Sequence, residues 1–213
     1  EMKKSRFLYY KSTLIAICLA LMLYTVALAA SGDLDTTFSG DGRVIQGFGG
    51  NSHLGSDVTL QADGKVVAVG SSWFSGDHDF AIARYKTDGS LDTTFSGDGR
   101  QVINFREFDE SQGVAIQTDG RIVVGGVACA VDGGNCVLAL ARLNPNGTLD
   151  TTFSGDGKLI TAVGLENGGW ELALQGNKIV VAGYVNDGTS FNGAVYRYNS
   201  NGSLDSTFSG DGI

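Results

Sequence analysis

The sequence predicts an all-β, propeller-type repeat protein with three antiparallel blade units. Three observations support this fold class. One motif of eleven residues occurs four times, short apolar strands separated by turn signals lie between its copies, and no segment after residue 30 keeps an apolar period of 3.6 residues. The 32 glycines and the single proline also suit a turn-rich β structure.

The motif reads Gly-Asp-Leu-Asp-Thr-Thr-Phe-Ser-Gly-Asp-Gly at residues 32–42. It returns nearly unchanged at residues 89–99, 147–157 and 202–212, at intervals of 57, 58 and 55 residues. A period of this length suits one small sheet per repeat. We therefore expect a repeat domain at 31–213 with units at about 43–99, 100–157 and 158–213.

Each unit has the pattern of four short strands. The first strand follows the motif and the second has a period of two residues, and we expect these at 43–48, 101–105 and 158–163, and at 57–61, 114–117 and 171–175. Turns at Asp63-Gly64, Asp119-Gly120 and Gly176-Asn177 come next, and the two Asp-Gly pairs suit two-residue hairpins. The turns should therefore join antiparallel neighbours.

The last two strands of each unit indicate how the blades pack. The third strand is almost continuously apolar, at residues 66–69, 122–124 and 179–182, which predicts burial on both faces. The fourth, at residues 80–85, 138–143 and 193–198, alternates small and larger residues in the first two units, as in Ala81 and Ala83. Small residues let a neighbouring sheet approach closely, so we expect stacked blades.

Three motifs together, G-x-LD-x-TF-x-GDG, Q-x-DGK-[IV]-VV-x-G and a-x-aRy-x-x-DG, resemble the delta-60 repeat family over residues 32–213. The resemblance implies a β-propeller-like arrangement, found in exported bacterial proteins that are often large and without an assigned biochemical role. The third unit departs from the pattern, because residues 175–178 are one residue shorter and lack the aspartate. The turn there must differ locally.

The number of blades is smaller than a ring requires. Residues 43–48 form an outer strand whose own blade is missing, and residues 212–213 stop before the outer strand of the third unit would begin. Rings normally need at least about four blades. Self-association or additional blades would complete a ring; otherwise the chain is an open arc or, as we favour, a fragment of a longer protein.

The first thirty residues have the layout of a secretory signal. A basic leader precedes an apolar run at residues 13–30, and small residues follow where a peptidase needs them; these residues are Lys3, Lys4, Arg6 and Lys11, then Ala27, Ala29 and Ala30. We expect cleavage after Ala29 or Ala30, no transmembrane segment thereafter, and a secreted or cell-surface protein. An uncleaved anchor helix is the alternative.

The charge balance limits the classes of partner. The chain has a net charge of −8, and without residues 1–30 it has 11 basic and 22 acidic residues, a net charge of −11. Such a charge argues against nucleic acid or an anionic membrane surface as a partner. We expect an extracellular ligand of unknown identity, either a glycan or a protein.

Two cysteines follow the leader, Cys129 and Cys136, and a glycine-rich loop separates them. In an oxidising compartment they are candidates for a local disulfide that fixes the loop. Metal ligation is the alternative, but the sequence has no CxxC and no histidine nearby.

Residues present in every unit are explained first by the architecture. An arginine recurs on the fourth strand and an aspartate in the motif, so we expect an ion pair between strand and motif, with ligand contact as the alternative. A motif phenylalanine should fill the core. These residues are Arg84, Arg142 and Arg197; Asp35, Asp92, Asp150 and Asp205; and Phe38, Phe95, Phe153 and Phe208.

The Gly-Asp-Gly loops raise the question of calcium. The best local cluster is Asp33, Asp35 and Asp41. One aspartate per loop is fewer than calcium prefers, no D-x-D-x-D-G run occurs, and Gly-Asp-Gly is also an ordinary turn sequence. We therefore expect no cofactor, with calcium as the alternative.

Residues found in one unit only are free for function. Polar and aromatic residues of this kind occur on the expected connections, and the candidate ligand-binding residues are Trp73, Phe74, Asp77, His78, Trp170 and Glu171. Aromatic rings beside carboxylates suit a carbohydrate, but they also pack against blades.

The sequence has no G-x-S-x-G, no Walker-type loop and no H-E-x-x-H. We therefore expect a non-enzymatic binding or surface-interaction module. One alternative is an extracellular hydrolase or lyase acting on polysaccharide, with Asp77 or Glu171 as acid or base near His78. Another is a purely structural segment of a larger surface protein.

Overall fold

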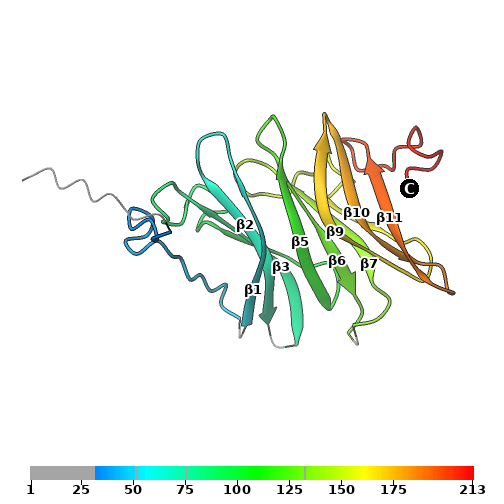
Figure 1. The fold of residues 1–213 in the computed structure, drawn as a ribbon, viewed down its shortest axis with the longest axis horizontal. Helices are drawn as coiled ribbons and strands as arrows, with labels where there is room; N and C mark the ends of the chain where they lie inside the picture. The colour runs from blue at the N-terminus through cyan, green and yellow to red at the C-terminus, as the bar shows by residue number, and fades with distance from the viewer. Residues whose placement is uncertain (1–31, 51, 75, 132) are drawn as a thin grey trace, which may run out of the picture. The chain divides into compact units, whose positions relative to one another are not determined.

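The computed structural model describes residues 32–213 except 51, 75 and 132 (Figure 1). The chain divides into two units, Glu1–Thr36 and Thr37–Ile213, and every described strand belongs to the second. The predicted leader at residues 1–30 lies outside the described residues. Among the residues that are described, no helix is suited to crossing a membrane.

The described strands form three consecutive blades, as predicted. Blade 1 contains β1 (Ser52–Leu60), β2 (Val66–Phe74), β3 (Asp77–Tyr85) and β4 (Arg100–Ile103); blade 2 contains β5 (Phe108–Ile116), β6 (Ile122–Cys129), β7 (Val137–Leu143) and β8 (Lys158–Thr161); blade 3 contains β9 (Glu166–Gln175), β10 (Lys178–Asn186) and β11 (Phe191–Tyr198). Neighbouring strands within each blade are antiparallel. The all-β, propeller-type fold class is therefore confirmed.

The expected strand at residues 43–48 is absent, so this prediction is wrong. Its counterparts β4 and β8 form ladders with β3 and β7, whereas residues 43–48 form no ladder with a described strand, although they lie near β1, β2 and β3. The segment still occupies the place of an outer strand. Arg100 Nη1 donates to the Gly47 carbonyl at 2.9 Å, as Lys158 Nζ donates to the Asn104 carbonyl at 3.0 Å.

The inner strands β1, β5 and β9 begin earlier than their period-two patterns indicate. Each contains a β-bulge, at which one residue has no partner on the neighbouring strand. A bulge shifts the alternation of side chains by one residue. The regular pattern therefore covers only the second half of each strand.

The turns between the inner strands and their neighbours join antiparallel strands, as predicted. In blade 1, Gly64 N donates to the Gln61 carbonyl at 2.9 Å, and of Asp63 and Gly64 only the glycine has a positive φ, of 80°. This is a longer loop that ends on a left-handed glycine, so the two-residue prediction is wrong there. Blade 3 does have a two-residue turn, because Gln175 pairs directly with Lys178.

The core lies between successive blades. Val67, Phe80 and Ile82 of blade 1 pack against residues of blade 2 such as Val124 and Ala139. In the second cluster, Leu138 and Leu140 of blade 2 meet Leu172, Val181 and Tyr196 of blade 3. Burying one such side chain contributes about 1.5–3 kcal/mol, so blade stacking is the main source of stability.

Candidate functional site

One ion network recurs in every blade. In blade 2, Arg142 Nε donates to Asp150 Oδ2 at 2.7 Å, and Arg121 Nε from the β5–β6 turn lies 2.9 Å from the same oxygen. Thr152 Oγ1 donates to Asp150 Oδ1 at 2.7 Å. The corresponding residues are Arg84, Lys65, Asp92 and Thr94 in blade 1, and Arg197, Lys178, Asp205 and Thr207 in blade 3.

The arginine of this network also connects blades. Arg84 Nη1 donates to the Pro145 carbonyl of the next unit at 2.5 Å, and Arg142 Nη1 donates to the Ser200 carbonyl. Each guanidinium lies 4.8 Å above the ring of Phe95 or Phe153. The geometry is that of the ion pair expected between strand and motif.

The network is not uniform at the ends of the repeat. Phe95 and Phe153 are fully buried, whereas Phe38 and Phe208 are half-buried and Asp35 is exposed. The turn cations Lys65, Arg121 and Lys178 are not among the site residues predicted from the sequence. Their signal was a basic residue directly after the turn in every unit.

The network holds its carboxylates in the charged form. Burial raises the pKa of Asp150, but hydrogen bonds from Thr152 and the charge of Arg142 outweigh it and hold the pKa below its usual value. The pKa of Asp205 is held well below its usual value by hydrogen bonds from Lys178 and Thr207. Groups that stay charged in this way suit a structural role.

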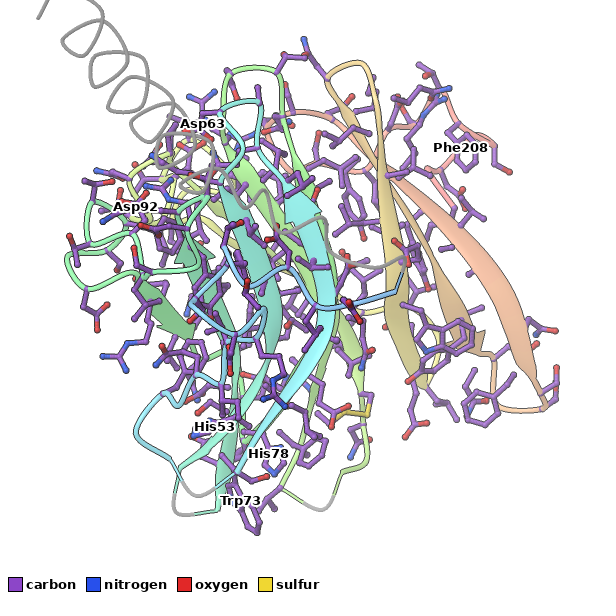
Figure 2. All side chains as sticks on the ribbon, turned by 60° about the vertical axis from the view of Figure 1, so that its left-hand side comes forward. His53, Asp63, Trp73, His78, Asp92 and Phe208 are labelled. Carbon is purple, nitrogen blue, oxygen red and sulfur yellow. A yellow bond between two sulfur atoms is a disulfide. The ribbon has the colours of Figure 1, made fainter. Side chains whose placement is uncertain are left out.

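A second, different site lies at the opposite end of the blades. Figure 2 shows Trp73, His78 and His53 at one end, far from Asp63 and Asp92. We call the Trp73 end, where the β2–β3 hairpin closes, the hairpin end. Trp73 and His78 pair across that hairpin with ring centroids 5.3 Å apart, and the His78 ring stacks on Phe108 of blade 2 at 4.2 Å.

Three carboxylates lie beside these rings, and one amide bridges two of them. Asn104 Nδ2 donates to Asp77 Oδ2 at 3.0 Å and to Asp79 Oδ1 at 2.8 Å. Asp109 accepts hydrogen bonds from the backbone amides of Phe105 and Arg106, at 2.5 and 3.0 Å. The site therefore joins β3 of blade 1 to the loop before β5 and to β5 itself.

Burial dominates the electrostatics of this group. It raises the pKa of Asp109 to about 7, against the backbone hydrogen bonds, and the charges of Asp79 and Asp77 raise it further. Burial also raises the pKa of Asp79, which is 8% exposed. Near neutral pH, Asp109 is therefore close to half protonated.

Two polar atoms of the site have no hydrogen-bond partner among the described residues, although both are buried. They are Asp77 Oδ1 and His78 Nδ1. Buried polar atoms are nearly always paired, with protein or with water. Both atoms lie next to a Trp73 side chain that is 42% exposed.

A family model described as "Domain of unknown function (DUF5122) beta-propeller" matches residues 61–95, 117–153 and 177–208. Each match runs from the turn before β2, β6 or β10 into the motif that carries the ion network. The chain is a β-propeller repeat protein. No curated protein matches it.

The propeller separates the six candidate ligand residues into two places. Trp73, Asp77 and His78 lie together at the hairpin end, and Phe74 ends β2, with its side chain outside the described part. Trp73 and Phe74 lie within β2, Asp77 and His78 within β3, and Trp170 and Glu171 within β9, so placing these six residues on connections was wrong. Trp170 is the bulged residue of β9.

Trp170 belongs to a separate aromatic group. Its ring centroid is 5.4 Å from that of Tyr184, which is 5.7 Å from that of Phe191. The site residues that sequence reasoning missed include Asn104, from the loop between β4 and β5, and Phe108, from β5 of blade 2. Only the folded propeller brings them to Trp73 and His78.

Asp109 occupies a position that the propeller repeats in all three blades. At this place a side chain accepts a hydrogen bond from the loop that precedes the inner strand. His53 Nε2 accepts from Phe48 N at 3.4 Å, and Asn167 Oδ1 accepts from Val163 N at 3.2 Å. The repeat needs an acceptor here, and blade 2 alone supplies a carboxylate.

Cys129 and Cys136 form a disulfide, with an S–S distance of 2.08 Å, in the hairpin loop of blade 2. Of the predicted calcium cluster, Asp41 accepts a hydrogen bond from Arg43 N at 3.0 Å and also pairs with its guanidinium. In the described part of the chain, no group of three or more His, Cys, Asp or Glu side chains could hold a metal. Calcium stays an untested alternative.

Proposed function

We propose that this chain is an exported, non-enzymatic propeller of the delta-60 repeat type that binds an extracellular glycan. The contact surface is the hairpin end of blades 1 and 2. The observation that carries the proposal is the exposed Trp73 ring beside two buried polar atoms, Asp77 Oδ1 and His78 Nδ1, that have no hydrogen-bond partner among the described residues.

The chemistry of these groups suits a sugar. A sugar ring has an apolar C–H face that packs on an aromatic ring, and its hydroxyl groups both donate and accept hydrogen bonds. A carboxylate oxygen such as Asp77 Oδ1 can accept from a hydroxyl, while His78 Nδ1 can donate or accept according to its tautomer. The stack on Phe108 fixes the orientation of the imidazole.

Charge narrows the class of glycan. Asp77, Asp79 and Asp109 lie beside the site, and the chain as a whole is acidic. An anionic polysaccharide would meet repulsion there, so the proposal is limited to neutral glycans. Export rests on the signal layout of residues 1–30, and the delta-60 assignment rests on the recurring motifs.

Calorimetric titration with neutral cello-, laminari- and xylo-oligosaccharides tests the proposal. We expect saturable binding that Trp73→Ala weakens at least about tenfold, a loss of about 1.4 kcal/mol. His78→Phe keeps an aromatic ring to stack on Phe108 and removes both ring nitrogens, so it should weaken binding without lowering the melting temperature. Unchanged affinity in both folded variants contradicts the proposal.

A further inference from the structure

The three inner strands share one irregularity at one position. In β1, β5 and β9 a single residue has no register partner, between Gly55 and Asp57, between Ser111 and Gly113, and between Gly169 and Glu171. The bulged residues are Ser56, Gln112 and Trp170, which we call the bulge row. Bulges redirect side chains and are frequent next to binding sites.

The repeat fixes each bulge through a glycine on the neighbouring strand. A Cβ atom at Gly70, Gly126 or Gly183 would lie 1.8, 2.0 or 1.8 Å from the carbonyl oxygen of Leu54, Glu110 or Gly168, respectively. Such distances are impossible without moving backbone. Every unit thus keeps the glycine and the bulge, while the bulged residue changes from serine to glutamine to tryptophan.

The three bulges lie on successive inner strands that touch one another. Ser56 Oγ donates to the Ser111 carbonyl at 2.6 Å, which joins the first bulge to the second. A Cβ on Gly113 would lie 3.2 Å from Leu172 N, so the second bulge abuts β9 next to the third. Figure 1 shows β1, β5 and β9 following one another. The bulge row is therefore continuous.

The bulge row is accessible in the described structure. Ser56, Ser71, Glu110 and Gln112 line part of a hollow of about 330 Å³ between β1 and β5. Trp170 is 58% exposed, and Glu171 beside it is also exposed. Hydroxyl, amide and carboxylate groups thus line a hollow at the first two bulges, and an exposed indole stands at the third.

We propose that the bulge row is a second binding site, which takes a neutral oligosaccharide along the inner strands. The amide of Gln112 and the carboxylates of Glu110 and Glu171 bind hydroxyl groups, and Trp170 stacks on a sugar ring. The proposal takes its ligand class from the proposed function but concerns different residues. The glycine and the bulge are the same in every unit, whereas the bulged side chain differs. This arrangement is expected at positions that determine ligand specificity.

The chain has two tryptophans, one in each site, so fluorescence can report on the sites separately. Trp73→Phe leaves Trp170 as the reporter of the bulge row, and Trp170→Phe leaves Trp73 as the reporter of the hairpin end. Titration of both full-length variants with the neutral oligosaccharides named above should give a saturable change in Trp170 emission. Gln112→Ala in the Trp73→Phe background should weaken that response at least about tenfold.

Gln46→Ala is the matched control, because Gln46 lies before β1 and donates to the Gly47 carbonyl. It should leave the Trp170 titration unchanged. If only Trp73 responds to sugar, the bulge row is wrong and the hairpin-end site stands. If only Trp170 responds, the hairpin-end site is wrong. A Trp170 response to oligolysine but not to sugar, or a Gln112→Ala variant with unchanged affinity, overturns the bulge-row proposal.

Discussion

Arg142 and Asp150 lie 2.7 Å apart through Nε and Oδ2, and both side chains are 4% exposed. The same arginine reaches the Ser200 carbonyl of the next unit. A single side chain thus ties a blade to its own motif and to its neighbour. This explains why the motif and the strand arginine recur together in the sequence.

Removing the carboxylate from this network should destabilise the fold strongly. Asp150→Ala leaves Arg142 buried without its anion and should lower the free energy of unfolding by about 3–5 kcal/mol. Denaturant unfolding followed by circular dichroism measures the change. Asp156→Ala is the control: this exposed aspartate of the same motif bonds Lys158 N, and its loss should cost within about 0.5 kcal/mol. Equal losses in the two variants would contradict the structural role.

Asp109→Asn should remove a pH dependence of stability. The folded-state pKa of about 7 lies above the ordinary value of about 3.9, so the folded state binds the proton more tightly. The stabilisation is complete below about pH 4 and is lost as pH rises to about 7. Asparagine is accepted at this position in blade 3, as Asn167, and it does not ionise.

The Asp109→Asn variant should therefore unfold less readily than the parent at about pH 8, by at least about 1 kcal/mol. Its stability should also fall less between about pH 4 and about pH 7. Chemical denaturation at a series of pH values checks both points. Parallel pH profiles for the two proteins would show that Asp109 titrates normally in the folded chain.

Gly126→Ala tests whether the glycine on β6 is needed to maintain the bulge of β5. The new Cβ would lie 2.0 Å from the Glu110 carbonyl oxygen, so the bulge must shift, at a cost of about 1–3 kcal/mol. Gly193→Ala is the control, since its Cβ meets nothing within 4 Å and its φ is not positive. That change should be neutral or stabilise by up to about 1 kcal/mol. Thermal unfolding of both variants separates a packing effect from a general effect of losing glycine.

Local signals in the sequence were sufficient to predict the three blades. Nearly regular motif spacing and turns such as Asp63-Gly64 identify the unit, and recurrence identifies Arg142 and Asp150. The missing strand at residues 43–48 could not be foreseen from its composition, because a strand needs a ladder partner and this segment forms no ladder with any described strand.

The candidate site was predictable only in part, for the same physical reason. Trp73, Asp77 and His78 are close in sequence and meet across one hairpin. Phe108 and Asp109 reach them only through packing between blades, which leaves no local pattern. Trp170 was assigned to a loop because a bulge breaks the period-two pattern of β9.

We propose that constant positions of the repeat hold the fold while variable positions bind. Thermal unfolding of Asp150→Ala and Trp73→Ala, each with and without a neutral oligosaccharide that the parent binds, tests it most directly. We predict that Asp150→Ala melts lower but is still stabilised by the sugar, as a ligand of the folded state requires. Trp73→Ala should melt like the parent and lose most of the stabilisation. The reverse pattern, with Trp73→Ala unstable but fully responsive to sugar, would contradict the account.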